Sequence, residues 1–416
     1  MRFVVMTVGI GILNRSGVVL ASDTFDPVIG IGAMKFVSIN KIFPLSKHHP
    51  VGVVLDGSVR YMDVIPWETI IEVYWSYIGD KSFDTLEEYA KSFIDFLPND
   101  NRFYSYSAEV SLINIVMNYC VDKVTGKDNL EENNREAIAD KVEKEIKFYS
   151  KESFINPFDD NFFKLFLEKH RKDLEEYLKS RIDFDIDLKT QENLILMCAY
   201  VTTKSNYMSE NINLGSIVIS GYGDKEIFPS LYRYKIVGTI DGKLIYRLEE
   251  SYSIGDDEED TKKIIPFGEE KDLINTYIKG INPELEKNIL MEIEKSFNEF
   301  LKEIQNKYNK NHVLQQFIEK EKDEINSISK MVMKGLMNHI NDLQQMEFIS
   351  PLLYMVDFIR KEDMISLAEA LVNLTSISVK FTPKKKAEVG PIDIAFITKG
   401  DGFQWIKTKE FYKYRI

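Results

Sequence analysis

Short apolar runs separated by turn residues open the chain. They predict strands over Phe3–Leu13, Gly17–Ser22, Lys35–Ile39, Lys41–Leu45 and Val51–Leu55. An apolar run, a polar turn at residues 14–16 and a second apolar run together are typical of a β-hairpin. Helices are predicted next over Val59–Ile78, with a kink or a new start near Pro66, and over Thr85–Phe96. Asp84, with Glu87 three residues later, is the predicted N-cap of the second helix.

The pattern becomes helical and highly charged between residues 101 and 210. Three segments have a helical period, and they are Asn133–Tyr149, Asp160–Ile182 and Gln191–Tyr200. No glycine occurs between Gly126 and Gly215. We therefore expect residues 101–210 to form a helical insertion.

Strand patterns return after the insertion, over Ser216–Ser220, Ser230–Ile236 and Lys243–Leu248. The acidic stretch Asp256–Asp260 follows. It lacks the glycine and the closing glutamate of a calcium-binding loop, so we expect a solvated loop there.

Two long apolar series follow, with steps of three and four residues. One runs from Leu285 to Tyr308 and the other from Val313 to Leu343. They predict an antiparallel helix pair over 281–346, which serves as core or as a subunit interface. A helix over Glu362–Leu374 and strands over Ile392–Thr398 and Gly402–Thr408 complete the chain.

Strands occur in consecutive groups and do not alternate singly with helices. This order argues against a doubly wound parallel sheet and favours antiparallel sheets packed with helices, an α+β architecture. The predicted core comprises residues 1–100, 211–280 and 347–416. The helical insertion 101–210 and the helical hairpin 281–346 would interrupt this core.

Charge and composition exclude several classes of protein. The 416 residues include 53 Lys and Arg against 66 Asp and Glu, a net charge of -13, whereas nucleic-acid binding needs clustered basic residues. No apolar run reaches membrane-spanning length. Cys120 and Cys198 cannot form a disulfide framework and are expected in the core. His48 and His49 are expected in a loop without a metal.

The apolar segment after Arg2 has two interpretations. It could be the core of a short signal peptide, or the first strand of the hairpin described above. The hairpin interpretation fits the following polar turn better, and it makes the cytoplasm the expected location.

Four separated residues form a candidate catalytic constellation. Thr7 precedes the first strand pattern, Asp23 ends the segment Gly17–Asp23, Lys41 precedes Ile42, and Gly57 follows Asp56. This arrangement resembles the proteasome β-type subunits and related bacterial threonine peptidases, which are N-terminal-nucleophile hydrolases. The spacing from Thr7 to Asp23 matches that family without a gap, whereas the interval from Asp23 to Lys41 is slightly longer.

The resemblance implies a fold and a chemistry. The fold would be a four-layer α/β/β/α sandwich with helical insertions. Thr7 would be the nucleophile, activated by its own free α-amine. Lys41 would stabilise negative charge near the hydroxyl, Asp23 would pair with Lys41, and the Gly57 N–H would donate to the oxyanion. No metal or organic cofactor is required.

Thr7 must become the first residue for this chemistry. Residues 1–6 could be removed autocatalytically, or translation could start at Met6. Two features depart from the family pattern, because no Asp and Ser pair precedes Gly390 and Glu269 stands where the family has a serine. A catalytically silent proteasome-like scaffold and a non-peptidase amidase therefore stay open as alternatives.

Each residue also has a simpler interpretation. Thr7 is a common strand residue, Asp23 and Lys41 could form a purely structural ion pair, and Gly57 could be a turn glycine. Asp56 beside it could contact the site, but a surface turn acid is the preferred interpretation. The resemblance further implies a peptide or protein substrate and a homo-oligomer, either a ring or a stack, with any unfoldase partner undefined. No nucleic-acid or membrane partner is expected.

Overall fold

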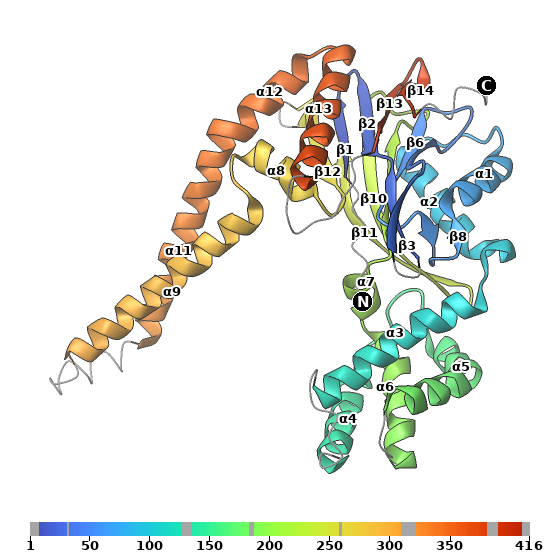
Figure 1. The fold of residues 1–416 in the computed structure, drawn as a ribbon, viewed down its shortest axis with the longest axis vertical. Helices are drawn as coiled ribbons and strands as arrows, with labels where there is room; N and C mark the ends of the chain where they lie inside the picture. Colours follow the sequence, from blue (N-terminus) through green and yellow to red (C-terminus); the bar gives the residue numbers. More distant parts are fainter. Residues whose placement is uncertain are drawn as a thin grey trace. The chain divides into compact units, whose positions relative to one another are not determined.

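The computed structural model describes residues 8–30, 33–126, 135–182, 187–257, 260–308, 322–380 and 390–409 (Figure 1). The chain divides into two compact units. Unit 1 comprises Met1–Ile39, Ile254–Phe396 and Trp405–Ile416, and unit 2 comprises Asn40–Ser253 and Ile397–Gln404. Each unit is therefore built from segments that are distant in the sequence.

The first five-stranded sheet has the order β12-β1-β2-β13-β14. Its strands are β1 (Gly9–Asn14), β2 (Gly17–Asp23), β12 (Lys262–Phe267), β13 (Ile392–Thr398) and β14 (Gly402–Lys407). The predicted hairpin is present, since β1 and β2 pair antiparallel with Asn14 opposite Gly17. A separate two-stranded sheet joins β3 (Phe25–Gly30) and β4 (Ala33–Ser38).

The second five-stranded sheet has the order β11-β10-β9-β6-β5. Its strands are β5 (Ile42–Pro44), β6 (Val51–Asp56), β9 (Ser216–Gly221), β10 (Ser230–Ile240) and β11 (Lys243–Ser253). A short hairpin of β7 (Arg60–Tyr61) and β8 (Ile65–Pro66) follows β6. The α+β class with antiparallel sheets is therefore confirmed.

The helices of unit 2 form one continuous core with its sheet. They are α1 (Trp67–Ile78), α2 (Leu86–Asn99), the 3-10 turn η1 (Asn101–Phe103), α3 (Tyr106–Thr125), α4 (Arg135–Tyr149), α5 (Asp160–Arg181), α6 (Leu188–Lys204) and α7 (Tyr207–Asn211). Cys120 and Cys198 are fully buried there, as expected. Burial also raises the pKa of the Cys120 thiol, so this side chain packs as a neutral apolar group.

The helices of unit 1 are α8 (Lys271–Lys279), α9 (Pro283–Tyr308), α11 (Lys322–Gln344), α12 (Ser350–Phe358) and α13 (Lys361–Lys380). The π-helical turn η4 (Gln345–Ile349) joins α11 to α12. A buried cluster joins α8, α12 and α13 to one face of β1 and β2 through Ile10, Ile12 and Val19. The helices α9 and α11 lie side by side (Figure 1), which confirms the predicted helix pair.

Several local predictions were wrong for identifiable reasons. The helix predicted over Val59–Ile78 begins only at Trp67, because residues 60–66 form the β7–β8 hairpin; the predicted new start near Pro66 is confirmed. The N-cap of α2 is Thr85, not Asp84, and Glu88 completes its capping box. The strands β3 and β12 were not predicted. Within the described residues, no helix is long and apolar enough to cross a membrane.

Candidate functional site

Asp23 lies at the end of β2, where it binds the backbone at the start of β1. Its Oδ1 accepts a hydrogen bond from the Val8 N–H at 3.0 Å, and its Oδ2 accepts one from the Phe25 N–H at 3.2 Å. The Ser22 hydroxyl donates to the Val8 carbonyl oxygen at 3.1 Å. Asp23 and Val8 are both buried. The Asp23 carboxylate therefore fixes the residue that directly follows Thr7 in the sequence; Thr7 itself lies outside the described residues.

Lys41 and Gly57 lie at the same end of the β5–β6 pair. The Leu55 N–H donates to the Lys41 carbonyl oxygen at 2.8 Å, which places Lys41 opposite a residue two positions before Gly57. The Lys41 side chain is fully buried. Burying an ammonium group is costly without compensating partners, so such a lysine usually has a specific electrostatic role.

Gly57 is required by the packing of two backbone segments. Its φ is +107°, and a Cβ atom there would lie 2.7 Å from the Cα of Gly215. Gly215 has a φ of +121°, and a Cβ atom there would lie 2.9 Å from the Ser58 nitrogen. The end of β6 and the start of β9 thus meet through two glycines. The fold therefore accounts for the glycine at position 57 independently of any catalytic role.

Asp56 is buried, so the expectation of a surface acid was wrong. Its Oδ2 lies 2.6 Å from Nη2 of Arg233 on β10, and Arg233 also approaches Glu249 and Glu250 on β11. The antiparallel pairing of β10 and β11 brings these glutamates beside Arg233. The sequence did not indicate this contact because Asp56 and Arg233 are far apart in the chain.

Asp393 on β13 is a buried acid that sequence reasoning missed. Its Oδ1 accepts a hydrogen bond from the Lys409 N–H at 3.0 Å. Burial raises the pKa of Asp393, and the nearby negative charge of Asp23 adds to this rise, while Lys409 opposes it. The strands β2 and β13 are neighbours in the first sheet, so two buried carboxyl groups share this part of unit 1.

The structure therefore groups the predicted residues in two places. Asp23 belongs to unit 1, together with Val8 and Asp393, whereas Lys41 and Gly57 belong to unit 2. The pairing of Asp23 with Lys41 stays a prediction, as does the role of Thr7.

A second buried polar cluster lies in unit 2, between the helical insertion and the β10–β11 turn. Nε2 of His170 on α5 lies 3.2 Å from Oε1 of Glu109 on α3 and 3.0 Å from Oδ2 of Asp241. The Asp241 N–H donates to Glu109 Oε1 at 2.9 Å. Lys169 Nζ contacts Asp241 and lies 3.3 Å from Glu109 Oε1. Glu109 and His170 are both fully buried.

A glutamate, a histidine and an aspartate could together hold a divalent cation. The surrounding charges instead favour a protonated His170 without a metal. Burial alone would lower the pKa of His170, but its hydrogen bonds to Asp241 and Glu109 outweigh burial and raise that pKa to about 9. Two carboxylates are thus balanced by an imidazolium and the Lys169 ammonium. A metal would have to deprotonate His170 and displace Lys169, so the geometry is that of a charge cluster.

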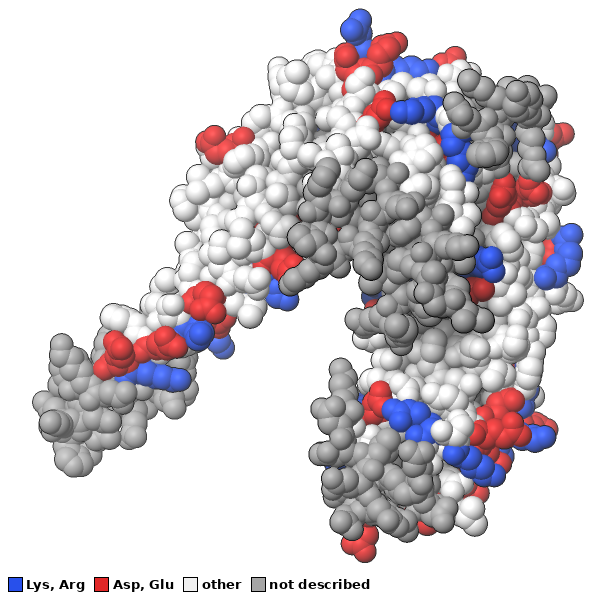
Figure 2. Space-filling model, viewed as in Figure 1, with Lys and Arg blue, Asp and Glu red and all other residues white. Residues whose placement is uncertain are grey.

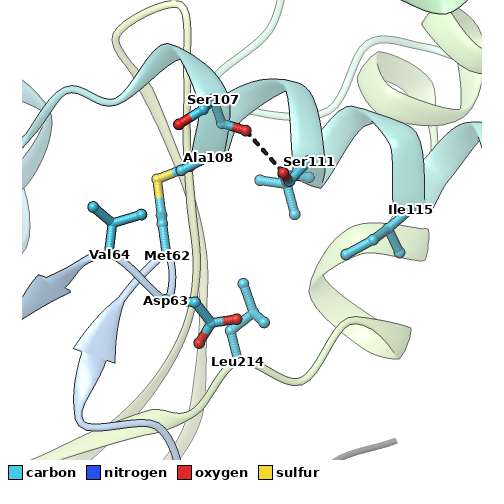
Figure 3. Close-up of a pocket in the computed structure, with 9 residues that line it drawn as sticks. Met62, Asp63, Val64, Ser107, Ala108, Ser111, Ile115 and Leu214 are labelled. Carbon is cyan, nitrogen blue, oxygen red and sulfur yellow. Dashed lines mark hydrogen bonds between the residues drawn. The ribbon is translucent and has the colours of Figure 1, made fainter. Parts of the chain in front are cut away.

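The pocket in Figure 3 lies elsewhere in unit 2, between α3 and the β7–β8 turn. Its cavity volume is ≈ 240 Å³, and most of its nine lining residues are apolar. Met62 and Asp63 line it with φ values of 50° and 60°. The Ser111 hydroxyl donates to the Ser107 carbonyl oxygen, and no lining residue is a histidine or a lysine that could activate it. The pocket thus offers a mostly apolar surface.

Comparison with known proteins adds no relative, because no protein-family model and no curated protein matches the chain.

Proposed function

We propose that this chain is a proteasome-like N-terminal-nucleophile hydrolase that cleaves amide bonds through Thr7. One observation carries the proposal most strongly. The Asp23 carboxylate binds the N–H of Val8, the residue after Thr7, at 3.0 Å. This contact holds the residue after the proposed nucleophile against Asp23, the acid that the motif pairs with Lys41.

The proposed reaction is acyl transfer in two steps. The Thr7 hydroxyl attacks the substrate carbonyl carbon, and its proton passes through the free α-amine to the leaving amine. Water then hydrolyses the resulting ester and restores the hydroxyl. Lys41 would stabilise the developing negative charge on the hydroxyl oxygen, and the Gly57 N–H would donate to the oxyanion. Asp23 would keep Lys41 protonated.

The two sheets are compatible with the proposed four-layer sandwich. Helices of unit 1 pack on one face of the sheet that contains β1 and β2. Helices of unit 2 belong to the same core as inward-facing residues of β6 and β9, such as Leu55 and Ile217. All residues of β1, β2, β6 and β9 are buried. Each sheet thus has a helix layer from its own unit, as the proposed sandwich requires.

Intact-mass spectrometry of the purified chain is the first test, because the mechanism needs a mature chain that begins at Thr7. The second test is labelling with an electrophile that reacts with an N-terminal threonine. We expect label on the wild-type chain and none on Thr7→Ala. A mature chain that keeps residues 1–6 would refute the catalytic proposal.

A silent scaffold on the same fold is the second candidate function. It is favoured by Gly57, whose contact with Gly215 needs no catalytic explanation, and by the absence of an Asp and Ser pair before Gly390 in the sequence. An unlabelled chain with intact residues 1–6 would support the scaffold. Labelling without peptide turnover would instead support an amidase with a non-peptide substrate.

A further inference from the structure

The helix pair α9–α11 leaves much of its apolar surface uncovered. Residues that face the other helix are half-buried, such as Leu290 and Phe297 on α9 and Leu336 and Ile340 on α11. A second set is between 36% and 56% exposed, and its members are Leu285, Ile289, Ile293, Phe300, Ile328, Val332 and Leu343. Exposed apolar side chains in such a contiguous group are typical of an interaction surface.

These seven residues lie on one side of the pair, whereas the exposed Met291 and Met337 lie toward the other side. At about 100° per residue, Ile289 and Phe300 lie about 80° around α9 from the half-buried residues. Val332 and Leu343 are rotated in the same sense around α11, by about 40–60°. The seven exposed residues form one stripe on each helix. Because the helices are antiparallel, a rotation in the same sense around each helix axis turns both stripes to the same side of the pair. The two stripes therefore form one apolar face, which we call the arm face.

Acidic residues border the arm face. Glu292, Glu299 and Glu303 follow its α9 edge, and Glu324 and Asp342 follow its α11 edge; all five are exposed. Three exposed lysines, Lys302, Lys330 and Lys334, lie further around the helices, toward the opposite side. Lys295 approaches Glu292 at 3.7 Å, but both side chains are largely exposed, so solvent screens this pair. Figure 2 shows charged side chains on the outer part of this arm and few near its base.

We propose that the arm face binds an amphipathic helix of another protein, one with an apolar stripe flanked by lysine or arginine. The apolar stripes supply the contact area, and the acidic edges select the charge of the partner. An anionic lipid surface would be repelled by the same edges. A second copy of this chain would bring identical acidic edges toward its own, which disfavours self-association. The inference does not depend on the chemistry of Thr7.

The test uses the full-length chain and two synthetic helices of roughly 18 residues, about five turns. Both carry one leucine stripe; one has lysine flanks and the other glutamate flanks. In fluorescence anisotropy, the lysine-flanked helix should bind at least about tenfold tighter, and added salt should weaken its binding. Val332→Asn should weaken the binding of both synthetic helices, because it places a polar group in the arm face.

Charge-reversal variants separate the arm face from the general negative charge of the protein. Glu299→Lys with Glu303→Lys should reverse the preference between the two helices. Glu152→Lys with Glu168→Lys changes the net charge equally at exposed positions in unit 2, and it should leave the preference intact.

Three kinds of result would overturn the proposal. The first concerns charge: the two synthetic helices bind equally, or the two pairs of charge reversals weaken binding of the lysine-flanked helix equally. The second is a sedimentation mass of the wild-type chain that corresponds to a dimer and falls to a monomer in Val332→Asn, which would identify a second copy as the occupant. The third is flotation with anionic vesicles that Val332→Asn abolishes, which would identify lipid.

Discussion

His170 should stabilise unit 2 in a way that disappears at alkaline pH. The imidazole is fully buried and bonds to Glu109 and Asp241. Its pKa is raised from 6.5 to about 9 in the folded chain. Because the folded-state pKa lies above the unfolded value, the stabilisation is complete below about pH 6.5 and is lost as the pH rises through about 9.

The pKa change sets the size of the effect. A rise of about 2.5 pH units at 1.36 kcal/mol per unit corresponds to about 3 kcal/mol of unfolding free energy in acid. About 2 kcal/mol of this remains at pH 7.5, and almost none remains at pH 10. The substitution His170→Gln removes the titration while keeping a polar side chain. It also removes ring packing on Phe166, and that loss does not depend on pH.

Urea unfolding of wild type and His170→Gln at a series of pH values measures this difference. Trp67 and Trp75 belong to unit 2 and Trp405 to unit 1, so a Trp405→Phe background makes tryptophan fluorescence report unit 2 alone. The difference in unfolding free energy between wild type and His170→Gln should narrow by about 2–3 kcal/mol from pH 6 to pH 10. Leu174→Ala, at a buried apolar position on α5, serves as the control, because it removes packing but no titratable group, and it should give no such narrowing. A gap for His170→Gln that stays constant with pH would refute a protonated, charge-paired His170.

Three further substitutions test other contacts. Gly57→Ala should destabilise the chain by about 1–3 kcal/mol, because the new Cβ would meet Gly215 at a positive φ; unchanged urea unfolding would contradict this packing. Lys41→Met should abolish any hydrolysis while leaving the sedimentation profile unchanged, and full activity would show that Lys41 is not part of the mechanism. Asp56→Asn should cost about 1–3 kcal/mol, because Arg233 would lose its closest carboxylate; Arg233→Met together with Asp56→Asn should recover part of that loss in thermal unfolding.

The local sequence predicted much of the secondary structure correctly. The β1–β2 hairpin follows from two apolar runs around a polar turn, and the helices α9 and α11 follow from apolar residues at three- and four-residue steps. These features depend on neighbours within a few positions, so a single sequence contains their signal. The β7–β8 hairpin was mistaken for helix because Val59–Pro66 contains no alternation strong enough to separate it from the helix after Pro66.

Contacts between distant residues were decided only by the tertiary structure. Glu109, His170 and Asp241 come from two helices and a strand turn, and no spacing in the sequence relates them. The same holds for Asp56 with Arg233 and for Gly57 with Gly215. The local sequence determined most of the strands and helices, and it showed which residues fit a hydrolase motif. Charge pairing and close backbone contact depend on distances of a few ångströms between segments, and only the packed chain sets those distances.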